Sequence, residues 1–332
     1  MENKMISVII PAYNAEKTIE RTLASLISNK DYIREIIMVD DNSTDDTVKQ
    51  ALKFSEHFNN FHIIGSEGWH NPGLARKTGM IHAHGEWITF LDADDCFTPS
   101  SLRYVSKQIA DSDAVILLCQ SIYYESGSFA PETIGHTDIS CGGNFYNRQY
   151  LFDRELFPHD ELTLSEDEYF NDIIFKQIKC DNLEHCIKHF DYPVYQVYHD
   201  IDFGQSHAIR NWADYCVKSH LEYKQYVADR FKDTEIRDLI IDEYCNNFIF
   251  AYFLFQALLL DKDLDHAEVT NQMIHFKRAI SYFENNLSSR EYLVNYYNIH
   301  EEETEGLWVS AMDCTGIEFD EYLQFDEFVE DL

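Results

Sequence analysis

The sequence predicts an α/β protein with a doubly wound, mainly parallel sheet, followed by a helical C-terminal region. Over the first hundred residues, short apolar runs alternate with amphipathic segments of helical spacing, which is the pattern of a sheet covered by helices. From about residue 209 the spacing is helical, and glycine and proline are scarce. We therefore expect two domains, at 1–207 and 208–332.

The expected strands are short and rich in β-branched residues, as strands buried on both faces are. They lie at residues 5–10, 36–39, 61–64 and 87–91. Pro11 ends the first of them. Because strand and helix alternate along the chain, the sheet should be parallel.

Three helices should connect these strands. The first is predicted by an apolar stripe formed by Ile19, Leu23, Leu26 and Ile27. Ser43 is a good N-cap for the second, with Asp45 and Asp46 in its first turn. The third should run over about 74–82 and stop at Gly85.

Polar clusters follow three of the expected strands, at Pro11–Asn14, Asp40–Ser43 and Asp92–Asp95. In a parallel sheet these clusters share one edge, where open α/β sheets bind ligands. One cluster could be turn chemistry alone. Three together indicate a site, because gathering charge at one edge is electrostatically unfavourable without a ligand.

Asp92 and Asp94 stand one residue apart at the end of the fourth expected strand. Carboxylates in this arrangement suit a hard divalent cation, Mg²⁺ or Mn²⁺, that is shared with a substrate diphosphate. The alternative is that these acids only cap the next turn.

The formal net charge is −33. Such a field repels nucleic acid and anionic lipid, so we expect no nucleic-acid partner. It also opposes an anionic nucleotide at long range. A divalent metal and a few well-placed basic residues would offset that repulsion locally.

Four motifs occur in order along the first hundred residues: Ser7–Asn14, Val39–Thr47, Asn71–Arg76 and Phe90–Asp95. Together they resemble the successive motifs of family 2 glycosyltransferases. The resemblance covers roughly residues 5–100 and extends more weakly to about 206. It implies a GT-A-type fold and an inverting transfer from a nucleotide-sugar.

The resemblance also implies roles for single residues. Pro11, Ala12 and Tyr13 would line the nucleobase pocket, and Asp41 would accept a hydrogen bond from the uracil N3–H group. Arg76 would face the diphosphate. The simpler alternatives are that Tyr13 is a packed aromatic, Arg76 a solvated helix charge and Asp41 a helix-capping acid.

The same resemblance makes Asp92 and Asp94 the DXD pair of the family. Asp92 would hold the ribose side of the nucleotide and the metal. Asp94 would contact the metal directly. The expected cofactor is Mn²⁺ or Mg²⁺.

An inverting transfer also needs a carboxylate that takes the proton of the acceptor hydroxyl. Ser165 and Glu168 have the spacing of a capping box, which places Glu166 and Asp167 in the first turn of a helix. Acids there can simply complement the helix dipole. The resemblance instead implies that Asp167 is the general base, with Glu166 as the next candidate.

A later segment, 198–207, resembles the family loop that closes over the diphosphate. Relatives often carry Arg or His shortly before its glycine, where this chain has Ile201–Phe203. The sequence leaves open whether His199, Asp202 or His207 completes the metal or phosphate site.

The C-terminal half should hold helices over about 209–232, 234–260 and 265–286. Residues 248–260 are apolar on all faces but too few to span a membrane, so they indicate a buried core helix. A homo-oligomer interface is the alternative. The acidic tail has aromatics every three residues, at Phe319, Tyr322, Phe325 and Phe328, and could form a docking helix.

We expect a cytoplasmic location, with peripheral attachment to the inner face of the membrane left open. The N-terminus enters a strand pattern without the shape of a signal peptide, and no run of about 20 apolar residues occurs. The eight cysteines are scattered without a Cys-x-x-Cys pair, which favours reduced thiols.

The leading hypothesis is a metal-dependent inverting glycosyltransferase that moves a sugar from a UDP-sugar to an acceptor hydroxyl, in bacterial surface glycan or glycoconjugate synthesis. The acceptor would be a glycan, a lipid-linked molecule or a protein. A catalytically inactive scaffold or accessory subunit is the alternative. A sugar nucleotidyltransferase is less favoured, because Pro11–Ala15 is not a Gly-rich basic loop for a triphosphate.

Overall fold

The computed structural model describes residues 5–110, 112–125, 133–136, 140–159, 166–199, 223–260, 277–300 and 307. The chain folds as two compact units, Met1–Gly204 and Gln205–Leu332. Our expected boundary between 207 and 208 stays a prediction, since residues 200–222 are not described.

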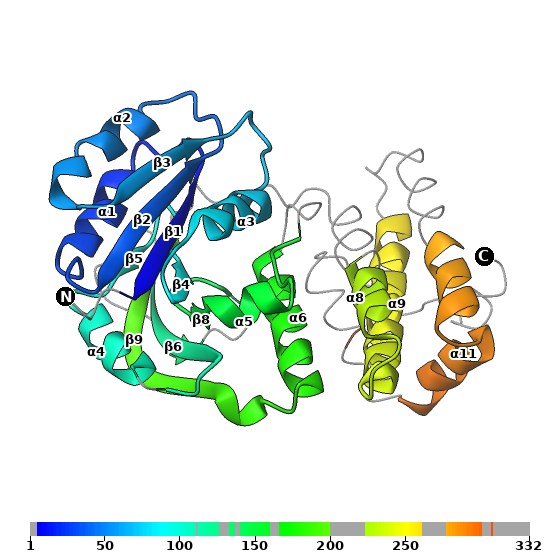
Figure 1. Ribbon diagram of the computed structural model, residues 1–332. Helices are drawn as coiled ribbons and strands as arrows, with labels where there is room; N and C mark the ends of the chain where they lie inside the picture. Colours follow the sequence, from blue (N-terminus) through cyan, green and yellow to red (C-terminus); the bar gives the residue numbers. More distant parts are fainter. Residues whose placement is uncertain are drawn as a thin grey trace. The chain divides into compact units, whose positions relative to one another are not determined.

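Four parallel strands form the first part of the sheet in the N-terminal unit (Figure 1). They are β1 (Ile6–Ala12), β2 (Ile33–Asp40), β3 (Phe61–Gly65) and β4 (Trp87–Phe90). β1 is central, with Ile9 beside Ile37 of β2 and Phe90 of β4. All three side chains are at most 1% exposed, as the continuous apolar runs predict.

The second part of the sheet is mixed, and the whole order is β3-β2-β1-β4-β8-β6-β9-β5, with β7 beside β6. The added strands are β5 (Cys96–Phe97), β6 (Ile116–Glu125), β7 (Thr133–His136), β8 (Phe145–Asn147) and β9 (Ile187–His199). β8 runs antiparallel to both β4 and β6, and β9 is parallel to β6. The mainly parallel α/β fold is confirmed, with an antiparallel portion that we did not predict.

Helices connect and cover the strands. In the N-terminal unit they are α1 (Ile19–Ile27), α2 (Thr47–Leu52), α3 (Pro72–His82), α4 (Leu102–Ile109), α5 (Arg148–Asp153) and α6 (Glu166–Cys180), with short 3₁₀ turns η1 (Ser55–His57) and η2 (Glu184–Cys186). α1 buries Ile19, Leu23 and Leu26 completely in the core, which confirms the predicted stripe.

The predicted start of the second helix is wrong. α2 begins only at Thr47, and Ser43 caps no helix. Its hydroxyl instead accepts a hydrogen bond from the Asn14 N–H group, 2.9 Å away. Asp45 accepts from the Thr47 N–H group at 3.0 Å, so it lies before the helix rather than in its first turn. The turn after β2 is bonded to the turn after β1, and these long-range hydrogen bonds override the local capping preference.

The C-terminal unit contains α8 (Tyr223–Phe231), α9 (Arg237–Leu260), a helical stretch at 277–286 and α11 (Arg290–Ile299). Phe248, Ile249 and Phe253 of α9 are fully buried, which agrees with a core helix. We did not predict α11, whose start is capped by the Ser289 side chain. The aromatic tail at 319–328 lies outside the described residues. Within the described chain, every helix is too short or too polar to cross a membrane.

Candidate functional site

The three polar clusters meet at one edge of the sheet, as their positions after parallel strands predict. The Asp41 N–H group donates to the Ala12 carbonyl oxygen at 2.8 Å, which joins the ends of β1 and β2. The Leu91 N–H group donates to the Ile9 carbonyl oxygen at 2.9 Å, which joins the end of β4 to the middle of β1, three residues before β1 ends. The acids after β2 and β4 therefore flank the end of the central strand.

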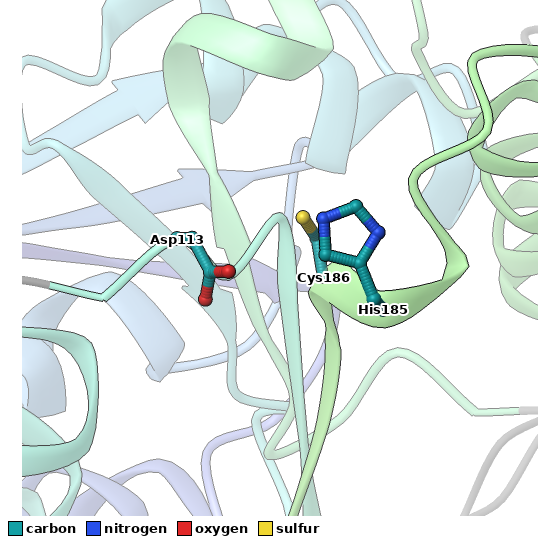
Figure 2. Close-up of side chains that lie close together, drawn as sticks. All are labelled: Asp113, His185 and Cys186. Atoms are coloured by element: carbon teal, nitrogen blue, oxygen red, sulfur yellow. The ribbon is translucent and has the colours of Figure 1, made fainter.

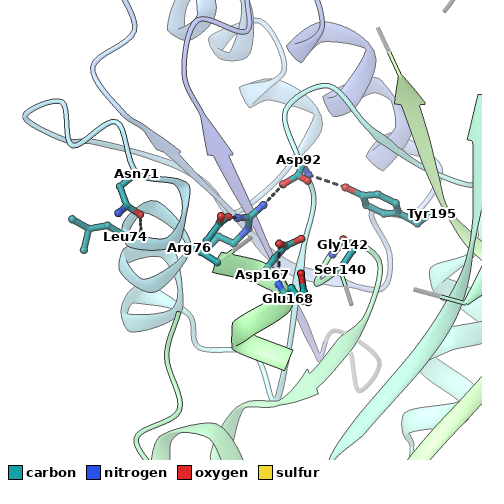
Figure 3. Close-up of polar contacts among 10 residues, drawn as sticks. Asn71, Leu74, Arg76, Asp92, Ser140, Gly142, Asp167, Glu168 and Tyr195 are labelled. Atoms are coloured by element: carbon teal, nitrogen blue, oxygen red, sulfur yellow. Dashed lines mark hydrogen bonds and ion pairs between the residues drawn. The ribbon is translucent and has the colours of Figure 1, made fainter. Parts of the chain in front are cut away.

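The Asp92–Asp95 loop is held by neighbouring elements at successive residues. The Asp92 N–H group donates to the Tyr195 hydroxyl of β9 at 3.0 Å (Figure 3). The Ala93 carbonyl oxygen accepts from the Thr22 hydroxyl at 2.9 Å, and that of Asp94 accepts from the Arg21 guanidinium. The backbone of this loop is thus fixed before any ligand binds.

The acids of this loop differ in their surroundings. Asp95 is buried, and its carboxyl accepts from the Tyr198 N–H group at 2.9 Å. Burial, with the neighbouring Asp94 and Asp92 charges, raises the pKa of Asp95 well above its usual range. Asp92 keeps 33% of its side chain exposed, and Asp94 is half-buried. The carboxylates within reach of a solvent cation are therefore those of Asp92 and Asp94, and such oxygens suit Mg²⁺ or Mn²⁺.

Arg76 lies between two acids rather than in solvent (Figure 3). Its side chain is 6% exposed, and one guanidinium nitrogen is 2.6 Å from an Asp92 oxygen while another bonds Glu166. The alternative of a solvated helix charge is therefore wrong. Contact of Arg76 with a diphosphate stays a prediction. Its ion pairs with Asp92 and Glu166 link the Asp92–Asp95 loop to α6.

Glu166 and Asp167 open α6, as predicted. Glu166 is 6% exposed, and its burial together with the Asp167 charge outweighs Arg76 and raises the pKa of Glu166 to about 7. Asp167 is half-buried and accepts from the Glu168 N–H group at 2.9 Å. Its charge acts on Arg76, and Figure 3 shows it next to Arg76 and Asp92. The predicted base, Asp167, therefore lies at the same sheet edge as Asp92 and Asp94. Ser165 of the expected capping box is not described.

Asp41 is 4% exposed, and its oxygens are already engaged. They accept from the Trp69 N–H group at 2.7 Å and the Asn71 N–H group at 3.2 Å, and they also bond the Ser66 hydroxyl. Asp41 therefore orders the loop after β3, and it does not cap α2. Its contact with uracil stays a prediction.

The residues expected to line the base pocket end β1. Pro11 and Ala12 are its last residues, and Ala12 is 4% exposed. Tyr13 is 44% exposed, so the alternative of a packed aromatic is wrong. The Tyr13 ring meets the His70 ring edge-on, with 4.9 Å between centroids.

Sequence reasoning missed the residues that hold the Asp92–Asp95 loop, chiefly Tyr195, Arg21 and Thr22. Tyr195 is 2% exposed and packs tightly on Gly143, where an added Cβ would lie 2.5 Å from the Tyr195 Cβ atom. This role of Tyr195 depends on where β9 pairs in the sheet, next to β5, and the sequence does not reveal that pairing. His199 ends β9, while Asp202 and His207 lie outside the described residues.

A second group of potential metal ligands lies elsewhere in the N-terminal unit (Figure 2). One ligand atom each from Asp113, His185 and Cys186 falls within 4.8 Å of the others. They precede β6 and β9, which start at the sheet edge opposite the DXD pair. Lys188 lies 3.2 Å from Asp113, and burial raises the pKa of the Cys186 thiol. This group is separate from the sheet edge that carries Asp92 and Asp94.

Comparison with known proteins agrees with this geometry. The sequence profile of Glycosyl transferase family 2 matches residues 7–174, just over half of the chain. The chain belongs to glycosyltransferase family 2. The resemblance inferred from the four motifs is thereby confirmed.

Curated relatives include bacterial proteins named for teichoic acid biosynthesis and for glycosyl transfer. Minor teichoic acid biosynthesis protein GgaA of Bacillus subtilis is 28% identical over 52% of this chain and 44% of its own length. Poly(ribitol-phosphate) beta-N-acetylglucosaminyltransferase TarS of Staphylococcus aureus is 29% identical over 49% of this chain and 31% of its own length. The chain thus spans less than half the length of these two relatives.

Among solved structures, S. aureus TarS 1-349 in complex with UDP-GlcNAc superposes with a TM-score of 0.64. The superposition covers 95% of this chain and 93% of the other, at 18% sequence identity. A second structure, the same TarS fragment in complex with UDP, gives a TM-score of 0.61. These likenesses confirm the GT-A-type fold with its helical C-terminal region.

Proposed function

We propose that this chain transfers a sugar from a UDP-sugar to an acceptor hydroxyl with inversion, using Asp167 as general base. The observation that carries the proposal is the convergence of Asp92, Asp94 and Asp167 at one sheet edge, with Arg76 joining Asp92 to the start of α6 through Glu166. The first two acids follow β4, and the third lies more than seventy residues later. Their meeting is a property of the fold and not of one local turn.

The chemistry follows from these positions. A divalent cation held by Asp92 and Asp94 would neutralise the departing diphosphate. Asp167 accepts the proton of the acceptor hydroxyl while the hydroxyl oxygen bonds the anomeric carbon. The bond from that carbon to the diphosphate oxygen breaks in the same step. Attack on the face opposite the leaving group inverts the configuration, as in other displacements assisted by one basic carboxylate.

The class of donor and acceptor rests on the relatives. TarS fragments bind UDP and UDP-GlcNAc, which supports a UDP-sugar donor for this chain. GgaA is named for minor teichoic acid biosynthesis and TarS for transfer of N-acetylglucosamine to poly(ribitol-phosphate), which supports an acceptor in a bacterial surface glycan or glycoconjugate. We also propose a cytoplasmic, peripheral place of action for this chain.

The test uses Asp167→Asn, with transfer, UDP affinity and melting temperature measured on the same sample. A general base predicts a loss of transfer of about two to four orders of magnitude with UDP affinity retained. The stability loss should stay near 0.5 kcal/mol, since Asn only removes a charge from a first helical turn. Glu168→Gln, an acid of the same turn, is the matched control and should keep transfer.

Two other outcomes would redirect the proposal. Unchanged transfer with a lower melting temperature would reduce Asp167 to a helix-stabilising acid and make Glu166 the next candidate. A wild-type protein inactive toward a full panel of nucleotide-sugars, with and without Mn²⁺, would favour an inactive scaffold.

A further inference from the structure

The loop between β3 and α3, Ser66–Asn71, is fixed at the ligand-binding edge of the sheet. Besides its three bonds to Asp41, it is braced internally, because the Ser66 hydroxyl accepts from the Gly68 N–H group at 3.0 Å. The Ser66 N–H group also donates to the Asp40 carbonyl oxygen at 2.9 Å. The loop therefore has a defined conformation, although its Trp69 and His70 side chains face solvent.

Left-handed backbone conformations gather in this loop and in the turns beside it. His70 has a φ of 50°, Asn14 of 48° and Asn42 of 60°, values that non-glycine residues rarely adopt. Gly68, at φ 91°, packs against Asn42, and a Cβ on it would lie 3.2 Å from the Asn42 amide nitrogen. Such strained backbone concentrates where a surrounding structure holds it for a ligand.

This ordered loop presents large aromatic surfaces to solvent. Trp69 is 36% exposed, and His70 is also exposed, although most described Phe, Tyr and Trp side chains of the unit are at least partly buried. The His70 ring lies at 80° to the Tyr13 ring, so the two form a corner at the end of β1. Flat aromatic faces that are rigid and exposed at a ligand site are suited to a planar base.

The same loop leads directly into the part of the site that faces the diphosphate. Asn71 caps α3 by accepting from the Leu74 N–H group at 2.9 Å, and one turn later Arg76 reaches Asp92. One continuous segment thus runs from Trp69 and His70 to Arg76, which contacts the Asp92–Asp95 loop. A nucleoside diphosphate likewise carries its base at one end and its phosphates at the other.

We propose that Trp69 and His70 contact the nucleobase of the donor together with Tyr13. Asp41 is then a positioning residue, because it is almost fully buried and acts through the loop that it holds. The inference rests on the proposed nucleotide-sugar donor. It adds residues that lie between the family motifs, where the sequence alone carries no assignment.

The experiment measures UDP and inorganic pyrophosphate affinity by calorimetry in the presence of Mn²⁺. Trp69→Ala and His70→Asn delete one ring each, and Asn tolerates the left-handed conformation at position 70. Each should weaken UDP binding about tenfold, the scale of one lost base-stacking contact, and leave pyrophosphate binding unchanged. Tyr104→Ala, which removes an aromatic side chain of similar exposure on α4, is the control and should leave both affinities unchanged.

A fluorescence measurement separates base contact from a general disturbance of the loop. UDP should change the tryptophan emission of the wild type, and Trp69→Phe should lose most of that change while keeping UDP affinity within about threefold. Equal UDP affinity in wild type, Trp69→Ala and His70→Asn would overturn this inference alone. A wild type that binds no nucleoside diphosphate would overturn the proposed function, and this inference with it.

Discussion

Glu166 offers a test of whether burial or ion pairing governs the centre of the site. Its carboxyl is 6% exposed beside Arg76, and burial raises its pKa to about 7 from a usual value of 4.5. A folded-state pKa above the unfolded one means that the folded protein binds the proton more tightly. The stability that Glu166 contributes is therefore fully present below about pH 4.5 and is lost as the pH rises through about 7.

The size of this effect follows from the same values. A difference of about 2.5 pKa units, at about 1.4 kcal/mol per unit, corresponds to roughly 3 kcal/mol between pH 4.5 and pH 8. Glu166→Gln removes the titration but keeps an oxygen that can accept from Arg76. We therefore expect the variant to match the wild type near pH 4.5 and to exceed its unfolding free energy by up to about 3 kcal/mol at pH 8.

The assay is urea unfolding followed by circular dichroism at pH 5, 6, 7 and 8. The difference between wild type and Glu166→Gln is compared, since other titrating groups cancel in that difference. Glu168→Gln controls for the loss of one negative charge near the start of α6. If Glu166→Gln were the less stable protein at pH 8, the ion pair with Arg76 would dominate, and the reasoning from burial would be wrong.

Three further predictions concern the Asp92–Asp95 loop and the binding of UDP beside it. UDP should bind at least tenfold more weakly in EDTA than with Mn²⁺, because uncompensated acids repel the diphosphate, and calorimetry showing equal affinities would contradict this. Asp94→Ala should lower transfer at least a hundredfold, whereas Asp41→Ala should mainly weaken UDP binding; near-normal turnover of Asp94→Ala at saturating metal would refute the metal assignment. Tyr195→Phe should lower the unfolding free energy by about 1–3 kcal/mol in urea titrations, because it leaves the buried Asp92 N–H group without its acceptor, and a change below about 0.5 kcal/mol would count against that hydrogen bond.

The sequence was most informative where local pattern and final structure have the same cause. The stripe on α1 and the apolar runs of β1 to β4 are buried because their period matches their element, so their existence and order could be predicted. The motif Phe90–Asp95 placed Asp92 and Asp94 at one edge for the same reason, because both follow a strand whose position the parallel topology fixes. Asp167 lies outside the four motifs, and its place was expected only from the resemblance of Glu166–Asp167 to the family.

The remaining features depend on contacts between distant residues, which leave no local period. Asp41 meets Trp69 and Asn71 across more than 25 residues, and these bonds determine what Asp41 does. Tyr195 reaches Asp92 across 103 residues. Ser43 had the right chemistry for a cap, but a partner on the neighbouring turn was available and the helix started later.

Because several acids surround Arg76, the stability of the N-terminal unit should depend on which ligands are bound at this sheet edge. Asp92, Glu166 and Asp167 place more negative charge near this guanidinium than one cation can balance. A cation or nucleotide that bound at this edge and not to the unfolded chain would add about 2.7 kcal/mol to the unfolding free energy at a hundred times its Kd. The protein should therefore persist longest in a cell that is rich in its own donor, so that its abundance follows the supply of substrate.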